Sequence, residues 1–205
     1  MNRIYKLHDN LKRDCFNQLP VVIKVTEFND TAYGKFSEQF ELAHNTGQSV
    51  IPIVIDSYGG YVYSLMGMVS LIKNTDIPVA TIFASKSMSC GAVLFSCGTE
   101  GMRYISPYAT LMVHSVSSWA VGKVDDMEIS VDEARRLNKE IYTIMEENIG
   151  KKKGTLLKHI KDNCNNGDWF LTPAEAKEWN FANHIGIPSF NVSVDIKTEL
   201  ALKHK

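Results

Sequence analysis

The sequence has little that would direct it to nucleic acid or to a membrane. Its 22 lysines and arginines are balanced by 23 aspartates and glutamates, so composition predicts no basic surface for nucleic acid or an anionic membrane. No apolar run is long enough to span a bilayer, and the polar N-terminal stretch lacks the apolar region of a secretory signal. We therefore expect a cytoplasmic protein that contacts neither nucleic acid nor membrane.

Metal-binding patterns are also missing. The four cysteines, Cys15, Cys90, Cys97 and Cys164, have no C-x-x-C spacing, and no two histidines stand at a ligand spacing with a carboxylate. A chain of 205 residues can bury a sizeable core without disulfides. We expect reduced thiols, with neither a metal nor another cofactor.

The first half of the chain repeats one pattern three times. Each unit begins with a short apolar stretch typical of a buried strand and continues with helical spacing of apolar residues. The predicted strands are 21–26, 50–55 and 77–84. The predicted helices are 30–46, 62–72 and 89–97, the first opened by Asn29 or Asp30 and stopped by Gly47. Strands alternating with helices predict an α/β fold with parallel βαβ crossovers.

The second half is organised differently. A short strand is predicted at 110–113, with His114 at its end. Residues 124–149 have the apolar spacing of one long amphipathic helix. Thr172 to Glu175 form a capping box with proline at the first helical position, which predicts a helix to about Trp179. No linker divides the chain, so we expect an N-terminal segment (1–19), one domain (20–187) and a tail (188–205) whose alternation predicts an extra strand.

Two glycine-bearing turns are candidates for chemistry, D-S-Y-G-G at 56–60 and S-M-S-C-G-A at 87–92. Both follow a predicted strand and precede a helix, the edge at which parallel α/β sheets bind ligands. Ser89 falls at the start of a helix, where it can be a nucleophile beside main-chain N–H donors or simply an N-cap. Spacing alone favours the cap.

His114 and Asp168 are equally ambiguous when each is taken alone. His114 closes the apolar run L-M-V-H, where a histidine is usually a hydrogen-bonded edge residue. Asp168 opens the apolar run W-F-L, so it is either a turn residue or a partly buried carboxylate in need of a partner.

Four segments in order resemble one known family. They are I-D-S-Y-G-G-Y-V-Y-S-L-M-G-M, S-M-S-C-G-A-V-L-F, L-M-V-H and D-W-F-L-T-P-A-E-A, and together they resemble the proteolytic subunit of Clp proteases from about Pro20 to Ile187. The resemblance implies a ClpP/crotonase-like α/β fold of repeated βαβ units with a long handle helix. It also implies a serine peptidase in which Ser89 is the nucleophile, His114 the general base and Asp168 the orienting acid.

Further roles follow from the same resemblance. Gly59 and Cys90 match the residues whose backbone N–H groups form the oxyanion hole, and Gly60, Ser115 and Val116 match positions that bind substrate. Cys90 stands where the family usually has methionine, which main-chain donation should tolerate.

The chain also departs from the family at three other places. Asp56 and Tyr58 replace the usual asparagine and proline of the first turn, and Gly167 replaces an arginine implicated in contact between rings. The segment after His114 matches the family's handle strand, but it has one glycine and no proline. These departures bear on assembly rather than on the hydrolytic centre.

The resemblance implies hydrolysis of unfolded polypeptides through an acyl-enzyme, inside a homo-oligomer built from a heptameric ring and possibly a 14-mer. The chain has no G-x-x-x-x-G-K-[ST] loop, so unfolding would require a hexameric Clp ATPase unfoldase as partner. Three alternatives remain: a non-catalytic structural subunit of a mixed ring, a signal-peptide-peptidase-like enzyme with a Ser-Lys pair using Lys86, and a crotonase-like acyl-CoA enzyme.

Overall fold

The computed structural model describes residues 20–117, 123–164 and 166–190. The N-terminal segment 1–19, the predicted tail strand and part of the handle segment therefore lie outside the described residues. Among the described residues, no helix is both long and apolar enough to cross a bilayer, and no group of side chains could hold a metal ion.

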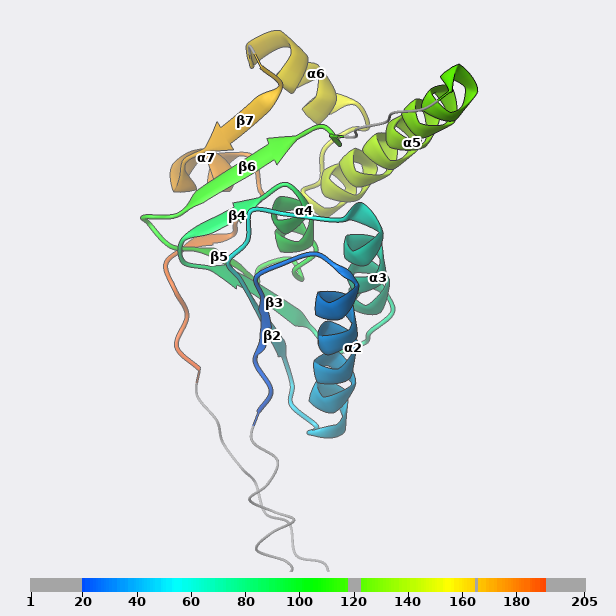
Figure 1. Ribbon diagram of the computed structural model, residues 1–205. Helices are drawn as coiled ribbons and strands as arrows, with labels where there is room; N and C mark the ends of the chain where they lie inside the picture. The colour runs from blue at the N-terminus through cyan, green and yellow to red at the C-terminus, as the bar shows by residue number, and fades with distance from the viewer. Residues whose placement is uncertain (1–19, 118–122, 165, 191–205) are drawn as a thin grey trace, which may run out of the picture.

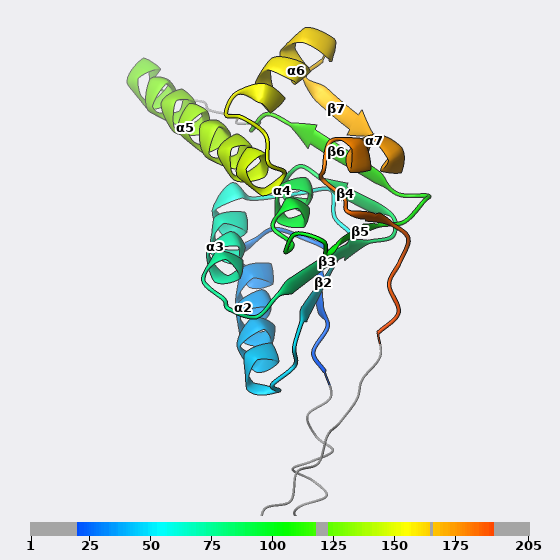
Figure 2. The ribbon, with the colours of Figure 1, turned by 180° about the vertical axis from the view of Figure 1, so that it is seen from behind.

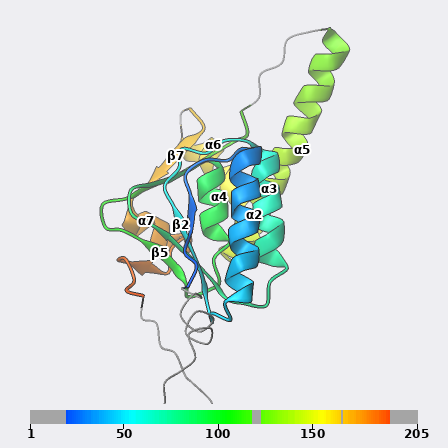
Figure 3. The same cartoon turned by 60° about the horizontal axis from the view of Figure 1, so that its bottom comes forward.

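The larger of two sheets has five strands in the order β1-β2-β3-β5-β8, all parallel. Its strands are β1 (Ile23–Val25), β2 (Ile51–Ile55), β3 (Val79–Phe83), β5 (Arg103–Ile105) and β8 (His184–Ile185). Three helices lie on one side of this sheet, as Figures 1 and 3 show: α2 (Asp30–Asn45), α3 (Val62–Lys73) and α4 (Cys90–Ser96). The predicted parallel strand–helix units are confirmed.

The smaller sheet has the order β4-β6-β7, with β4 (Lys86–Met88) parallel to β6 (Thr110–His114) and β7 (Asp168–Leu171) antiparallel to it. In this register His114 lies directly opposite Asp168. Helix α7 (Pro173–Glu178) follows β7 and has the predicted capping box.

Two further helices connect β6 to β7, α5 (Val124–Asn148) and α6 (Thr155–Asn163). The view from behind in Figure 2 shows that α5 runs away from the body of the molecule toward its N-terminal end. The long helix was predicted from its period. Its exposed end carries Val124 and Ile129, which are 63% and 69% exposed.

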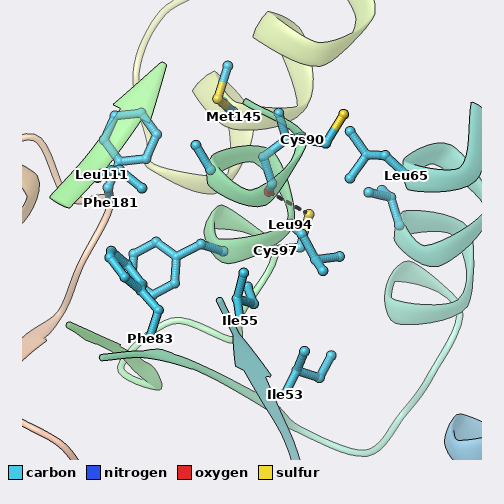
Figure 4. Packing of buried hydrophobic residues seen from close by; sticks show 14 of the residues in the cluster. Ile53, Ile55, Leu65, Phe83, Cys90, Leu94, Cys97, Leu111, Met145 and Phe181 are labelled. Carbon is cyan, nitrogen blue, oxygen red and sulfur yellow. Dashed lines mark hydrogen bonds between the residues drawn. The ribbon is translucent and has the colours of Figure 1, made fainter. Parts of the chain in front are cut away.

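Helix α4 lies in the middle of the core, and all seven of its residues are buried. Figure 4 shows it between Leu65 of α3, Met145 of α5 and Ile55 of β2. A helix surrounded on all sides is fixed by packing rather than by its own short ladder of hydrogen bonds. The residue that precedes it, Ser89, is therefore attached to a helix that is buried along its whole length.

Candidate active site

Ser89 joins β4 to α4 in a strained conformation, with φ 54° and ψ −120°. Its N–H donates to the Met112 carbonyl at 2.9 Å, which ties it to the neighbouring strand. Although Ser89 holds the N-cap position, its side chain makes no capping hydrogen bond. The capping role that spacing alone favoured is therefore wrong. Strain of this kind costs about 1–3 kcal/mol and persists only where the surrounding structure enforces it.

The Ser89 hydroxyl instead meets His114, whose Nε2 lies 2.8 Å from Ser89 Oγ. His114 reaches this position because β6 ends beside β4, and its side chain is 23% exposed. An Nε2 that accepts the hydroxyl proton requires a neutral ring protonated at Nδ1. This pair has the arrangement needed for base-assisted attack by serine.

Asp168 stands on the other side of the imidazole but is less closely engaged. Its Oδ1 lies 3.7 Å from His114 Nδ1, beyond hydrogen-bonding distance. The sequence left open whether Asp168 is a turn residue or a partly buried carboxylate; it is the first residue of β7, and its side chain is 46% exposed at the edge strand of the small sheet. The structure thus brings the three residues together, but Asp168 lies beyond hydrogen-bonding distance of His114.

The Gly59–Gly60 turn packs against Ser89. Gly59 has φ +113°, and a Cβ built there would lie 2.6 Å from Ser89 Cβ and 3.0 Å from its Oγ. Only glycine fits this close approach. The Gly59 N–H, which the resemblance assigns to the oxyanion hole, donates to Ser57 Oγ at 3.1 Å. The Gly60 N–H donates to no backbone carbonyl of another described residue.

Cys90 is the first residue of α4, so its N–H has no acceptor within the helix. Its side chain is buried, and Sγ donates to the Gly60 carbonyl oxygen at 3.2 Å. Burial raises the pKa of the Cys90 thiol from the ordinary 9.0 to about 11. The thiol is therefore neutral at physiological pH and is not itself a nucleophile.

Ser115 and Val116 lie on the far side of His114, against α5. The Val116 N–H donates to Asn138 Oδ1 at 2.9 Å, and Ser115 Oγ lies 3.4 Å from the Tyr142 hydroxyl. Both residues line a groove of about 410 Å³ that α5 closes on its other side. The groove does not include Gly60, so the three predicted substrate-binding residues do not share one cavity in the single chain.

Comparison with known proteins identifies the family of the chain. Residues 8–188 match the Clp protease family. The chain belongs to the Clp protease family. An ATP-dependent Clp protease proteolytic subunit of Bacteroides fragilis is 32% identical over 135 residues, 66% of this chain and 63% of that protein. One from Porphyromonas gingivalis is 31% identical over 135 residues, covering 66% and 59%. Subunit 1 from Salinibacter ruber is 27% identical over 176 residues, covering 84% and 73%. The matches to the first two span about three-fifths of those relatives.

Asp56 and Tyr58, two residues that set this chain apart from the usual Clp pattern, both contact Lys86. Lys86 Nζ lies 2.6 Å from Asp56 Oδ1 and 4.6 Å from the centre of the Tyr58 ring. The hydrogen bond to Asp56 raises the pKa of Lys86 above its ordinary value. A charged lysine held by a carboxylate is a poor general base, which removes the support for a Ser-Lys pair.

One residue of the site escaped the sequence analysis. Ser57 is 1% exposed, and its hydroxyl accepts the Gly59 N–H in the turn that packs against Ser89. The available signal was a serine two residues before a glycine in a turn, since serine side chains often bond the backbone two residues on.

Proposed function

We propose that this chain is a serine endopeptidase, the proteolytic subunit of an ATP-dependent Clp-type protease in a reducing compartment such as the cytoplasm. Ser89 acts as nucleophile, His114 as general base and Asp168 as the acid that orients the imidazole. The observation that carries the proposal is the 2.8 Å contact between Ser89 Oγ and His114 Nε2. A serine that merely capped the helix would have no need of it.

In the first half of the reaction, His114 Nε2 takes the Ser89 proton as Oγ attacks the peptide carbonyl carbon. Collapse of the tetrahedral intermediate breaks the C–N bond, and the imidazolium gives its proton to the departing amine. Water then attacks the acyl-enzyme, with His114 again as base. Asp168 stabilises the imidazolium in both halves, and a closer approach than 3.7 Å strengthens that effect.

The oxyanion is held by the Cys90 N–H together with an N–H of the Gly59–Gly60 turn. The Gly59 N–H would have to leave Ser57 Oγ in order to donate. Gly60 is the freer donor, since its N–H is held by no backbone carbonyl of another described residue. Pre-oriented main-chain donors of this kind contribute strongly to acyl transfer.

Substrates are unfolded polypeptides delivered by a hexameric Clp ATPase, and the chain forms a closed heptameric ring that can pair into a 14-mer. Two observations support assembly: the relatives carry the name of a subunit, and Val124, Ile129 and Val131 leave apolar surface exposed on α5. Light scattering should show a particle of at least seven chains, and a persistent monomer or dimer would refute the ring.

A non-catalytic ring subunit is the second candidate, and one observation favours it: Asp168 does not reach hydrogen-bonding distance of His114. Turnover separates the two candidates. The assembled chain should cleave a fluorogenic peptide, and Ser89→Ala should abolish cleavage. Ser87→Ala is the matched control, because Ser87 is the neighbouring buried serine and its hydroxyl has no partner among the described residues. Activity lost in both variants, or in neither, would contradict the assignment of Ser89.

A further inference from the structure

The Gly59–Gly60 turn is confined between two parts of the chain. On one side Gly59 approaches Ser89, and on the other a Cβ on Gly60 would lie 2.4 Å from the Phe28 carbonyl oxygen. Two glycines present no side chains that could pack and hold the turn in place. Whatever fixes it next to the nucleophile must come from its neighbours.

Two buried side chains supply hydrogen bonds to the turn. Ser57 Oγ accepts the Gly59 N–H at 3.1 Å, and Cys90 Sγ donates to the Gly60 carbonyl at 3.2 Å. The peptide unit between Gly60 and Tyr61 is also held from its other side, because the Tyr61 N–H donates to Phe28 O at 2.7 Å. The peptide units on either side of the Gly59–Gly60 bond are thus both tethered.

We propose that Cys90 is a positioning residue, whose thiol holds the Gly59–Gly60 turn against Ser89 by donating to the Gly60 carbonyl. This inference rests on the proposed peptidase function. Cys90 then acts in two ways. Its main-chain N–H is one donor of the oxyanion hole, and its side chain holds the turn that provides the other donor. The methionine usual in the family has no hydrogen to donate, so this tether distinguishes the present chain.

The tether should act on the chemical step rather than on substrate binding. Donors to an oxyanion are effective when they already stand where charge develops, and displacement of the turn would weaken only the transition state. One hydrogen bond of ordinary net strength corresponds to about a two- to tenfold change in rate.

The chain contains a matched control in the same helix region. Cys97 is also buried, at the C-terminal end of α4, and its Sγ donates to the Val93 carbonyl at 3.3 Å, far from the turn. Cys90→Ala and Cys97→Ala therefore remove the same side-chain atoms and one thiol-to-carbonyl hydrogen bond each, and Cys97→Ala also removes the bond that Cys97 Sγ accepts from Asn148 at 3.4 Å. Only the first touches the proposed oxyanion hole.

The experiment measures kcat and KM for a fluorogenic peptide, together with the inhibition constant of a peptide boronate that forms a tetrahedral adduct with serine. We expect Cys90→Ala to lower kcat and weaken boronate inhibition by about two- to tenfold, with KM unchanged. Cys90→Ser, which keeps a donor, should recover part of the loss. Cys97→Ala should leave all three constants unchanged. Equal constants for Cys90→Ala and wild type, or an equal loss in Cys97→Ala, would overturn the proposal.

Hydrogen exchange tests the tether without relying on activity. Peptides covering 56–63 should exchange faster in Cys90→Ala than in wild type or Cys97→Ala, since the Tyr61 N–H lies in the tethered unit. Unchanged exchange would refute the tether. If instead Ser89 proves unreactive while exchange rises, the peptidase function fails and the structural part of the inference stands.

Discussion

The two sides of His114 are built differently. On one side, the position of Ser89 is set by the buried helix that it precedes, by its strained backbone and by the glycine turn. Its Oγ lies 2.8 Å from the imidazole. On the other, Asp168 comes from an edge strand, is 46% exposed and lies 3.7 Å away. The interior of the single chain thus fixes the nucleophile and base, whereas the acid stands where neighbours and solvent can move it.

The largest expected effect comes from a comparison of the imidazole itself with the acid on its exposed side. His114→Ala should lower kcat by about a millionfold, as removal of a triad base does elsewhere. Asp168→Asn should cost less, by about one to two powers of ten, because the contact it removes is long and solvent-exposed. Single-turnover kinetics on both variants would measure this. Equal losses would mean that Asp168 is engaged as closely as Ser89 in the working enzyme.

A second test changes the packing around Ser89 on the interior side. Gly59→Ala places a Cβ 2.6 Å from Ser89 Cβ and should lower kcat by about a hundredfold through displacement of the nucleophile. Gly101→Ala is the control: Gly101 also has positive φ, +84°, but its Cβ would meet nothing within 4 Å. Both variants carry backbone strain, and only Gly59→Ala should lose activity. Similar activity in the two variants would show that the close approach to Ser89 is unimportant.

The third test concerns the buried thiols behind the nucleophile. Burial raises the pKa of both Cys90 and Cys97 from 9.0 to about 11, so the stability that each neutral thiol contributes is present below pH 9 and lost as pH rises toward 11. The shift corresponds to about 2 to 3 kcal/mol per thiol.

Denaturant unfolding between pH 8 and 11 would measure this loss. Wild type should lose stability across that range more steeply than Cys97→Ala, even though the variant starts from a lower value. Parallel slopes would contradict burial of the Cys97 thiol.

The smallest expected effect lies on the exposed side. Gly167 has φ +78° and open space around it, so Gly167→Ala should lower the free energy of unfolding by about 1–2 kcal/mol through strain alone. Gly167→Asn should cost less, because asparagine tolerates this conformation. The arginine usual in the family would carry the same backbone strain at this position. Equal stability of wild type and Gly167→Ala, measured by thermal unfolding, would contradict this.

Sequence periodicity predicted the fold where elements are long. The helices from Asp30, Val62 and Val124 and the first three strands of the parallel sheet, β1, β2 and β3, appear within a few residues of their predicted ends. Strong apolar periods and capping residues are local signals, which one sequence contains in full.

The elements that the sequence did not predict are short, or they depend on residues from other parts of the chain. Strand β5 has three residues and pairs with strands 20 or more positions away, so no period reveals it. Helix α6 starts where Gly154 and Leu156 donate their N–H groups to the buried Glu146 carboxylate at 2.8 Å. That cap comes from the preceding helix, which no local pattern could indicate.

The site shows the same division. Recognition of motifs brought Ser89, His114 and Asp168 together, but the exposure of Asp168 depends on its place at a sheet edge. The contact of Cys90 with the glycine turn depends on how two separate segments meet, and a sequence pattern does not encode that geometry.

The central claim is that the Ser89 hydroxyl is activated by His114, and covalent labelling tests it most directly. The assembled chain is treated with a fluorophosphonate, and the modified peptide is identified by mass spectrometry in wild type, His114→Ala and Ser89→Ala. We expect one adduct on Ser89 in wild type, formed far more slowly in His114→Ala and absent in Ser89→Ala. An adduct on another serine, or labelling of Ser89 at the same rate without His114, would contradict it.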